Sequence, residues 1–123
     1  MLWFAVAAGG AVGAMARYGV SVVLATQHIK FPIATLTVNV LGSFLMGVCY
    51  VIIVEKGLIA QEWRHVVMIG FMGAFTTFST FSLESLHLLQ SGHFLTAASY
   101  MIISLLACVL AVFLGITITD NLL

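Results

Sequence analysis

Four long apolar stretches follow one another along the 123-residue chain, and short polar breaks separate them. Each stretch reaches the roughly 20 residues that cross the hydrocarbon core of a bilayer as a helix. The pattern therefore predicts an all-α integral membrane protein, with residues 1–123 forming a single domain. The four expected spans are 2–25, 33–54, 63–89 and 95–119.

Polar residues and helix breakers mark the three connectors, which are short. The first span begins with MLWFAVAAGG, which lacks the basic region of a secretory signal and continues beyond the usual length of one. We therefore expect this span to be retained. The connectors are marked by Gln27, His28, Lys30 and Pro32, by Glu55, Lys56, Gly57, Gln61 and Glu62, and by Gln90, Ser91, Gly92 and His93.

The composition agrees with a membrane protein, because 63% of the residues are hydrophobic and only 7% are charged. Soluble domains carry roughly 25% charged residues, so a water-facing surface could not be covered here. Four basic residues balance four acidic ones, and no nucleic-acid partner is expected. Cys49 and Cys108 lie far from any C-x-x-C spacing, so no zinc site or disulfide framework is predicted.

The basic residues give no clear orientation in the membrane. Four spans place both termini on one side together with Lys56 and Arg64, whereas Lys30 and Arg17 fall on the other side. Two interpretations stay open: the chain inserts both ways and pairs with an inverted copy of itself, or four charges are too few to define a bias.

Small residues four positions apart predict close helix packing, as for Gly9 with Gly13 and Ser43 with Gly47. A single four-helix chain is too thin to enclose a wide pore. We therefore expect an oligomer, with any pathway built partly at its interface.

Polar groups at membrane depth are costly, by roughly 2.5–3.5 kcal/mol for a central charge, and are functional candidates by default. Arg17 either extends to the membrane surface or gathers anions in a vestibule. Asn39 either bonds to another helix or lines a path. Glu84 is the one acid well inside a span. Such a carboxylate could alternately bind a proton and a cationic substrate in an exporter.

The segment GFMGAFTTFSTF, residues 70–81, combines glycines with four hydroxyls that compete for backbone hydrogen bonds. A break in the third helix near 73–78 is one interpretation, and a continuous helix with back-bonded hydroxyls is the other. Free carbonyls at a break hold cations, and the N-terminus of the following half-helix favours anions.

Four phenylalanines in this segment recur at intervals of four, three and three and share one helical face: Phe71, Phe75, Phe78 and Phe81. Such a stripe ordinarily packs against helices or lipid. Here Ser79 and Thr80 lie between the last two rings. Because aromatic edges are positive and hydroxyls donate hydrogen bonds, the pattern also suits a weak site for a small anion, as conduction requires.

Three motifs resemble the bacterial fluoride channels called Fluc or CrcB: GGAVGAMARY (9–18), TVNVLGSFLMG (37–47) and GFMGAFTTFSTFSLE (70–84). They occur in the family's order in a chain of its size. The resemblance implies a passive channel, not an enzyme, that exports fluoride through the bacterial inner membrane. It also implies a dual-topology homodimer, in which two inverted copies form two antiparallel pores.

The same resemblance implies roles for individual residues. Gly73 and Thr76 match positions whose carbonyls, from both subunits, hold a structural sodium ion that is not transported. In the fourth span, Cys108 stands where a further pathway hydroxyl is expected, which leaves the length of the polar track open. The residues implied for the fluoride pathway are Phe78, Phe81, Asn39, Ser79, Thr80, Tyr100 and Ser104.

Two other function classes remain open at this point. One is a small dual-topology, proton-coupled exporter of hydrophobic cations that uses Glu84. The other is a noncatalytic packing subunit of a larger membrane complex, which would transport nothing by itself.

Overall fold

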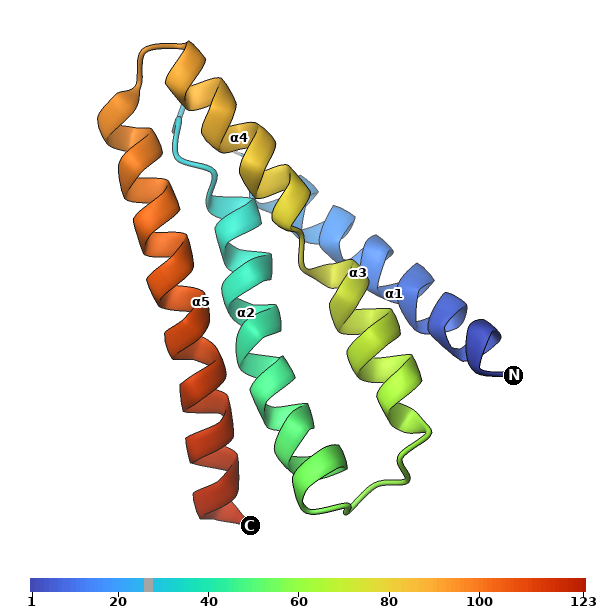
Figure 1. The fold of residues 1–123 in the computed structure, drawn as a ribbon. Helices are drawn as coiled ribbons and strands as arrows, with labels where there is room; N and C mark the ends of the chain where they lie inside the picture. Colours follow the sequence, from blue (N-terminus) through green and yellow to red (C-terminus); the bar gives the residue numbers. More distant parts are fainter. Residues whose placement is uncertain (26–27) are drawn as a thin grey trace.

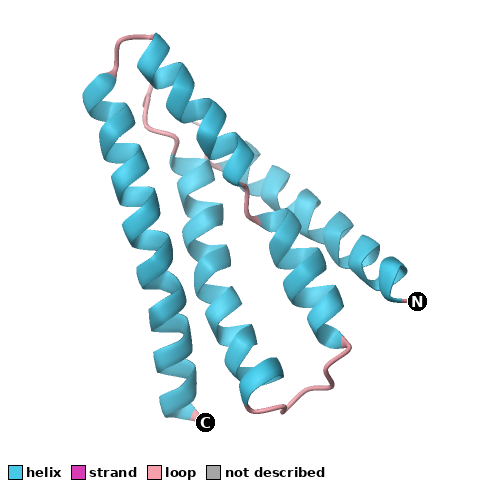
Figure 2. Cartoon of the chain, in the orientation of Figure 1, coloured by secondary structure: helices cyan, strands magenta, loops and turns pink. Residues whose placement is uncertain are grey.

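The computed structural model describes residues 1–25 and 28–123, and over these residues its regular structure is entirely helical (Figures 1 and 2). Gln27, one of the expected connector markers, lies outside the described residues. In chain order the helices are α1 (Leu2–Val23), α2 (Ile33–Cys49), η1 (Tyr50–Glu55), η2 (Arg64–Met72), α3 (Gly73–Phe75), α4 (Phe78–Gln90) and α5 (Phe94–Leu122).

Four helices in the described part of the chain are long and apolar enough to cross a membrane, which confirms the prediction of an all-α protein with four such helices. The second combines α2 with η1, and the third runs from η2 to the end of α4. Their limits are Leu2–Val23, Ile33–Glu55, Arg64–Gln90 and Phe94–Leu122. The π-helical turns of η1 and η2 were not expected, because hydropathy does not report how tightly a helix is wound.

The backbone changes direction inside the third of these helices. α3 ends at Phe75, and the next two residues have extended backbone: Thr76 has ψ 157° and Thr77 has φ −151° and ψ 112°. α4 begins at Phe78. Figure 2 shows the resulting non-helical connection between α3 and α4, which we call the 76–77 link.

Glycines allow neighbouring backbones to approach closely. A Cβ atom at Gly9 or Gly13 of α1 would overlap backbone carbonyls of η2, and one at Gly47 of α2 would meet the Val112 carbonyl of α5. Figure 1 shows α2 and α5 side by side, in agreement with this contact. The predicted small-residue contacts at these three glycines are confirmed, whereas Ser43 lines a groove described below.

One end of the bundle carries a small aromatic core. Tyr100 is fully buried there with Leu88 and Ala97, and Phe31 meets its ring edge-on at 5.4 Å between centroids. At the opposite end, Lys56 Nζ lies 2.7 Å from Asp120 Oδ1. The hydrogen bond and opposite charge of Asp120 raise the pKa of Lys56 above its ordinary value. The contact ties the end of α5 to the end of η1.

Candidate functional site

Asn39 of α2 holds the 76–77 link through two hydrogen bonds. Its Nδ2 donates to the Thr77 carbonyl at 3.0 Å, and the Thr77 N–H donates to its Oδ1 at 2.7 Å. The side-chain amide thus pairs with the backbone N–H and C=O of Thr77, as a residue of a neighbouring extended strand would. Of the two interpretations open for Asn39, the bond to another element is established, and the residue also lines a groove.

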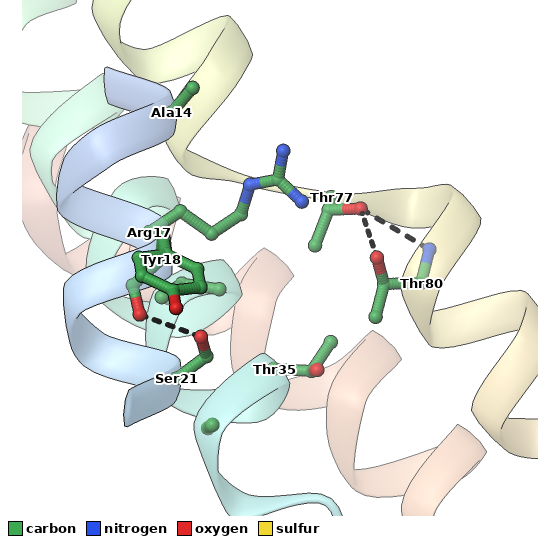
Figure 3. A pocket seen from close by; sticks show the side chains of 9 residues that line it. Ala14, Arg17, Tyr18, Ser21, Thr35, Thr77 and Thr80 are labelled. Atoms are coloured by element: carbon green, nitrogen blue, oxygen red, sulfur yellow. Dashed lines mark hydrogen bonds between the residues drawn. The ribbon is translucent and has the colours of Figure 1, made fainter. Parts of the chain in front are cut away.

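Thr77 starts α4 by capping its first turn (Figure 3). The Thr77 Oγ1 accepts a hydrogen bond from the Thr80 N–H at 3.2 Å and donates to the Thr80 Oγ1 at 3.0 Å. An N-cap threonine that serves the backbone three residues on is a common way to begin a helix. Sequence reasoning grouped Thr77 with the other hydroxyls and missed this role. The sequence signal for the cap was the spacing of Thr77 and Thr80, because an N-cap side chain bonds to the backbone N–H two or three residues further on.

The link also removes regular partners from two carbonyls. In an uninterrupted helix the Thr77 N–H would bond to the Gly73 carbonyl, and the Thr80 N–H to the Thr76 carbonyl. Here the first donor bonds to Asn39 and the second to the Thr77 hydroxyl. The carbonyls of Gly73 and Thr76 are therefore released from the helical ladder, at the two positions that the family resemblance implies as cation ligands.

Arg17 reaches the same region from α1 (Figure 3). Its Nε donates to the Ala74 carbonyl at 3.0 Å, and its side chain is half-buried. It also borders a hollow of about 260 Å³ between α1, α2 and the start of α4. The polar lining of this hollow is Arg17, Tyr18, Ser21, Thr35, Thr77 and Thr80.

A larger groove of about 550 Å³ opens beside the link, between α2, α4 and α5. The hydroxyl of Ser104 is buried there without a hydrogen-bond partner among the described residues. Ser43 and Cys108 also line the groove and supply a hydroxyl and a thiol. The groove brings together five of the predicted site residues: Asn39, Thr76, Phe78, Phe81 and Ser104.

The four phenylalanines form two pairs instead of one continuous stripe, because the link interrupts the helical register. Phe71 stacks on Phe75 at 5.6 Å with an interplanar angle of 13°. Phe78 and Phe81 lie 5.4 Å apart and are tilted by 42°. Phe78 is 79% exposed, so its ring has little cover from its own chain.

Tyr100 and Glu84 support Phe81 without lining the groove. The Phe81 and Tyr100 rings lie 5.2 Å apart, and the Tyr100 hydroxyl donates to Glu84 Oε2 at 3.2 Å. The Thr35 hydroxyl donates to Glu84 Oε1 at 2.5 Å. Sequence reasoning missed Thr35, although its place one turn before Asn39 puts both on one helical face. Ser79 is exposed and stands outside the groove.

Residues 1–25 and 28–123 contain no cluster of three or more His, Cys, Asp or Glu side chains suited to a metal ion. The released carbonyls of Gly73 and Thr76 are backbone oxygens. Oxygen ligands of this kind suit a hard cation.

The fold and this site define a small multi-pass membrane protein whose polar groups gather around an irregular segment of one span. The chain belongs to the CrcB family, since the family model described as "CrcB-like protein, Camphor Resistance (CrcB)" matches residues 4–116.

Several relatives are named fluoride-specific ion channel FluC. The protein of that name from Saccharophagus degradans is 62% identical over 122 residues, covering 99% of this chain and 92% of the relative. The Hahella chejuensis protein is 49% identical over 115 residues, covering 93% and 91%. The Magnetococcus marinus protein is 47% identical over 114 residues, covering 92% and 93%.

Replacing Asn39 by leucine is expected to destabilise the protein and loosen the 76–77 link. The variant keeps a side chain of similar size but leaves the backbone N–H and C=O of Thr77 without their Asn39 partner, at about 1–3 kcal/mol for each unsatisfied group. Thermal unfolding in detergent and hydrogen exchange of the 70–81 segment measure the effect. Ser43→Ala, on the same helix and in the same groove, is the control. Equal unfolding temperatures for the two variants would contradict the role of the amide.

Proposed function

We propose that this protein is a fluoride channel that passively exports fluoride from the bacterial cytoplasm across the inner membrane and so lowers intracellular fluoride. The observation that carries the proposal is the groove, where Asn39, the rings of Phe78 and Phe81 and the Ser104 hydroxyl meet, the last without a partner in the part of the chain that the structure describes. The relatives named fluoride-specific ion channels support the choice of ion.

The groove suits a small anion because it offers hydrogen-bond donors without a full positive charge. The Nδ2 of Asn39 uses one N–H on Thr77 and has a second to offer. The Ser104 hydroxyl is free to donate, and phenylalanine edges carry partial positive charge. Several weak contacts replace part of the hydration shell while allowing the ion to leave, which conduction requires. Ser79 and Thr80 complete the proposed pathway, and Tyr100 supports it through its contact with Phe81.

We further propose that the working unit is a homodimer of two inverted copies with two antiparallel pores. The large exposed fraction of Phe78 supports this proposal, because a ring in an ion pathway needs a second wall. The equal distribution of Lys and Arg between the two sides supports the inverted arrangement. In this proposal the 76–77 link is a functional break in the third span, buried at the interface where irregular backbone is tolerated.

A structural sodium ion at the dimer centre completes the proposal. The carbonyls of Gly73 and Thr76 from both copies would hold it, and the diversion of the Thr77 and Thr80 N–H groups supports this assignment. The ion would neutralise carbonyl dipoles that face each other across the interface. It would not be transported.

Liposomes loaded with fluoride are expected to release it rapidly when they contain the purified protein, and to retain chloride. A fluoride electrode and a chloride electrode record the two effluxes, with empty liposomes as the control. Efflux should need no pH gradient, because a channel moves the ion down its own electrochemical gradient. Equal chloride release would overturn the selectivity. Loss of a hydrophobic cation from the same liposomes that requires a pH gradient and fails in Glu84→Gln, without fluoride efflux, would favour the exporter. No release above that of empty liposomes would favour a packing subunit.

The variants Phe78→Ile and Phe81→Ile are expected to reduce fluoride efflux by at least about tenfold, because isoleucine removes the positive ring edge. Size-exclusion chromatography should show unchanged assembly. Phe113→Ile, at a 60% exposed position on α5 outside the groove, is the matched control and should conduct as the unmodified protein does. Wild-type efflux from both groove variants would remove the rings from the mechanism.

Replacing sodium by N-methylglucamine at constant ionic strength is expected to lower the thermal midpoint of the detergent-solubilised protein and to shift it from dimer to monomer. A ligand that binds only the assembled state stabilises it by mass action. Analytical ultracentrifugation measures the assembly state. A sodium-independent monomer would contradict the proposal.

The inverted arrangement is tested separately, with a protease-cleavable tag at the C-terminus of the membrane-inserted protein that reports its orientation. Cleavage of about half of the tags from one side is expected for mixed insertion.

A further inference from the structure

We infer that Arg17 is a positioning residue that fixes the end of α3 through its Nε–H group, not through its charge. The relevant contact is the hydrogen bond from Arg17 Nε to the Ala74 carbonyl, which joins residues 57 positions apart in the sequence. In Figure 3 the side chain extends from α1 to the 76–77 link and ends beside Thr77.

The need for this donor follows from the backbone around the link. In a regular helix the Ala74 carbonyl would accept the N–H of Phe78, but Phe78 begins α4 beyond two extended residues. The Ala74 carbonyl lies next to that of Gly73, whose regular donor is also diverted. An unpaired carbonyl in a membrane interior is costly, so a donor from another helix stabilises the end of α3.

The placement of α1 makes this reach possible. Gly13 lies one turn before Arg17, and the absence of its side chain lets α1 touch the backbone of Phe71. Arg17 can therefore reach the Ala74 carbonyl with Nε, the nitrogen of its side chain that lies nearest the backbone. Asn39 holds the other side of the link through Thr77. The two residues clamp the link from α1 and from α2, and Arg17 thereby sets where the Gly73 and Thr76 carbonyls point.

Arg17→Gln and Arg17→Met separate the donor from the charge. The glutamine Nε2 stands the same number of bonds from Cα as the arginine Nε, so it keeps a donor at the critical atom and removes the charge. Methionine places a methyl group there and removes both. Arg17→Lys keeps the charge, with its nitrogen one atom further from Cα. Arg64→Met, at an exposed position in the first turn of η2, is the control for loss of one positive charge.

Hydrogen exchange of peptides from 70–81, compared with peptides from α5, is the primary measurement. We expect wild-type exchange in Arg17→Gln and Arg64→Met, and faster exchange in Arg17→Met that is confined to 70–81. Faster exchange in Arg17→Gln would overturn the inference, and so would wild-type exchange in Arg17→Met. If Arg17→Met does not fold, the glutamine variant decides alone.

Fluoride efflux is the second measurement, and it rests on the proposed function. Arg17→Gln should conduct within about threefold of the unmodified protein, whereas Arg17→Met should lose at least about tenfold, because it leaves the Ala74 carbonyl without its donor. Equal losses in both variants, with conduction retained in Arg17→Lys, would assign Arg17 to anion attraction instead. If the unmodified protein does not transport fluoride, the proposed function fails, and the exchange experiment still tests the positioning role.

Discussion

The constraint on which the rest of this structure depends is that backbone N–H and C=O groups at membrane depth need partners within the protein. A continuous helix meets this need by itself, and the 76–77 link does not. Partners for the link and for the end of α3 before it come from other helices. Asn39 pairs with the backbone N–H and C=O of Thr77, and Arg17 donates to the Ala74 carbonyl. Two of the polar residues whose placement in apolar spans needed explanation, Arg17 and Asn39, are therefore the ones that make the extended backbone tolerable.

Close packing is what brings these partners within reach. Gly9 and Gly13 let α1 lie directly on η2, and a Cβ at Gly42 would meet the Thr76 side chain. Larger residues at these positions would move α1 and α2 away from the link and lengthen its hydrogen bonds. The small residues and the polar residues thus act together, since the first set the distances over which the second can bond. This coupling connects the general packing of the bundle to the geometry of the candidate site.

Much of this arrangement is predictable from sequence, because hydropathy directly reports four lipid-crossing helices, and glycine spacing reports close contacts at Gly9, Gly13 and Gly47. The candidate residues also stand out, since polar side chains are rare in such spans. The pairing of Asn39 with Thr77 is not predictable, because contacts across 38 residues depend on the register of two helices. The same limit hid the ring–ring contact of Phe81 with Tyr100 and the bond from Thr35 to Glu84.

The position of Glu84 bears on how the proposed anion path and a carboxylate share one half-helix. A carboxylate facing the groove would repel an anion strongly at low dielectric. Here both of its oxygens accept hydrogen bonds, from Thr35 and from the buried Tyr100, and it does not line the groove. The Tyr100 ring packs on Phe81, so the groove is faced by a ring while the acid is held behind it. This arrangement turns Glu84 into an anchor for the aromatic wall, and it leaves the groove to groups that donate hydrogen bonds.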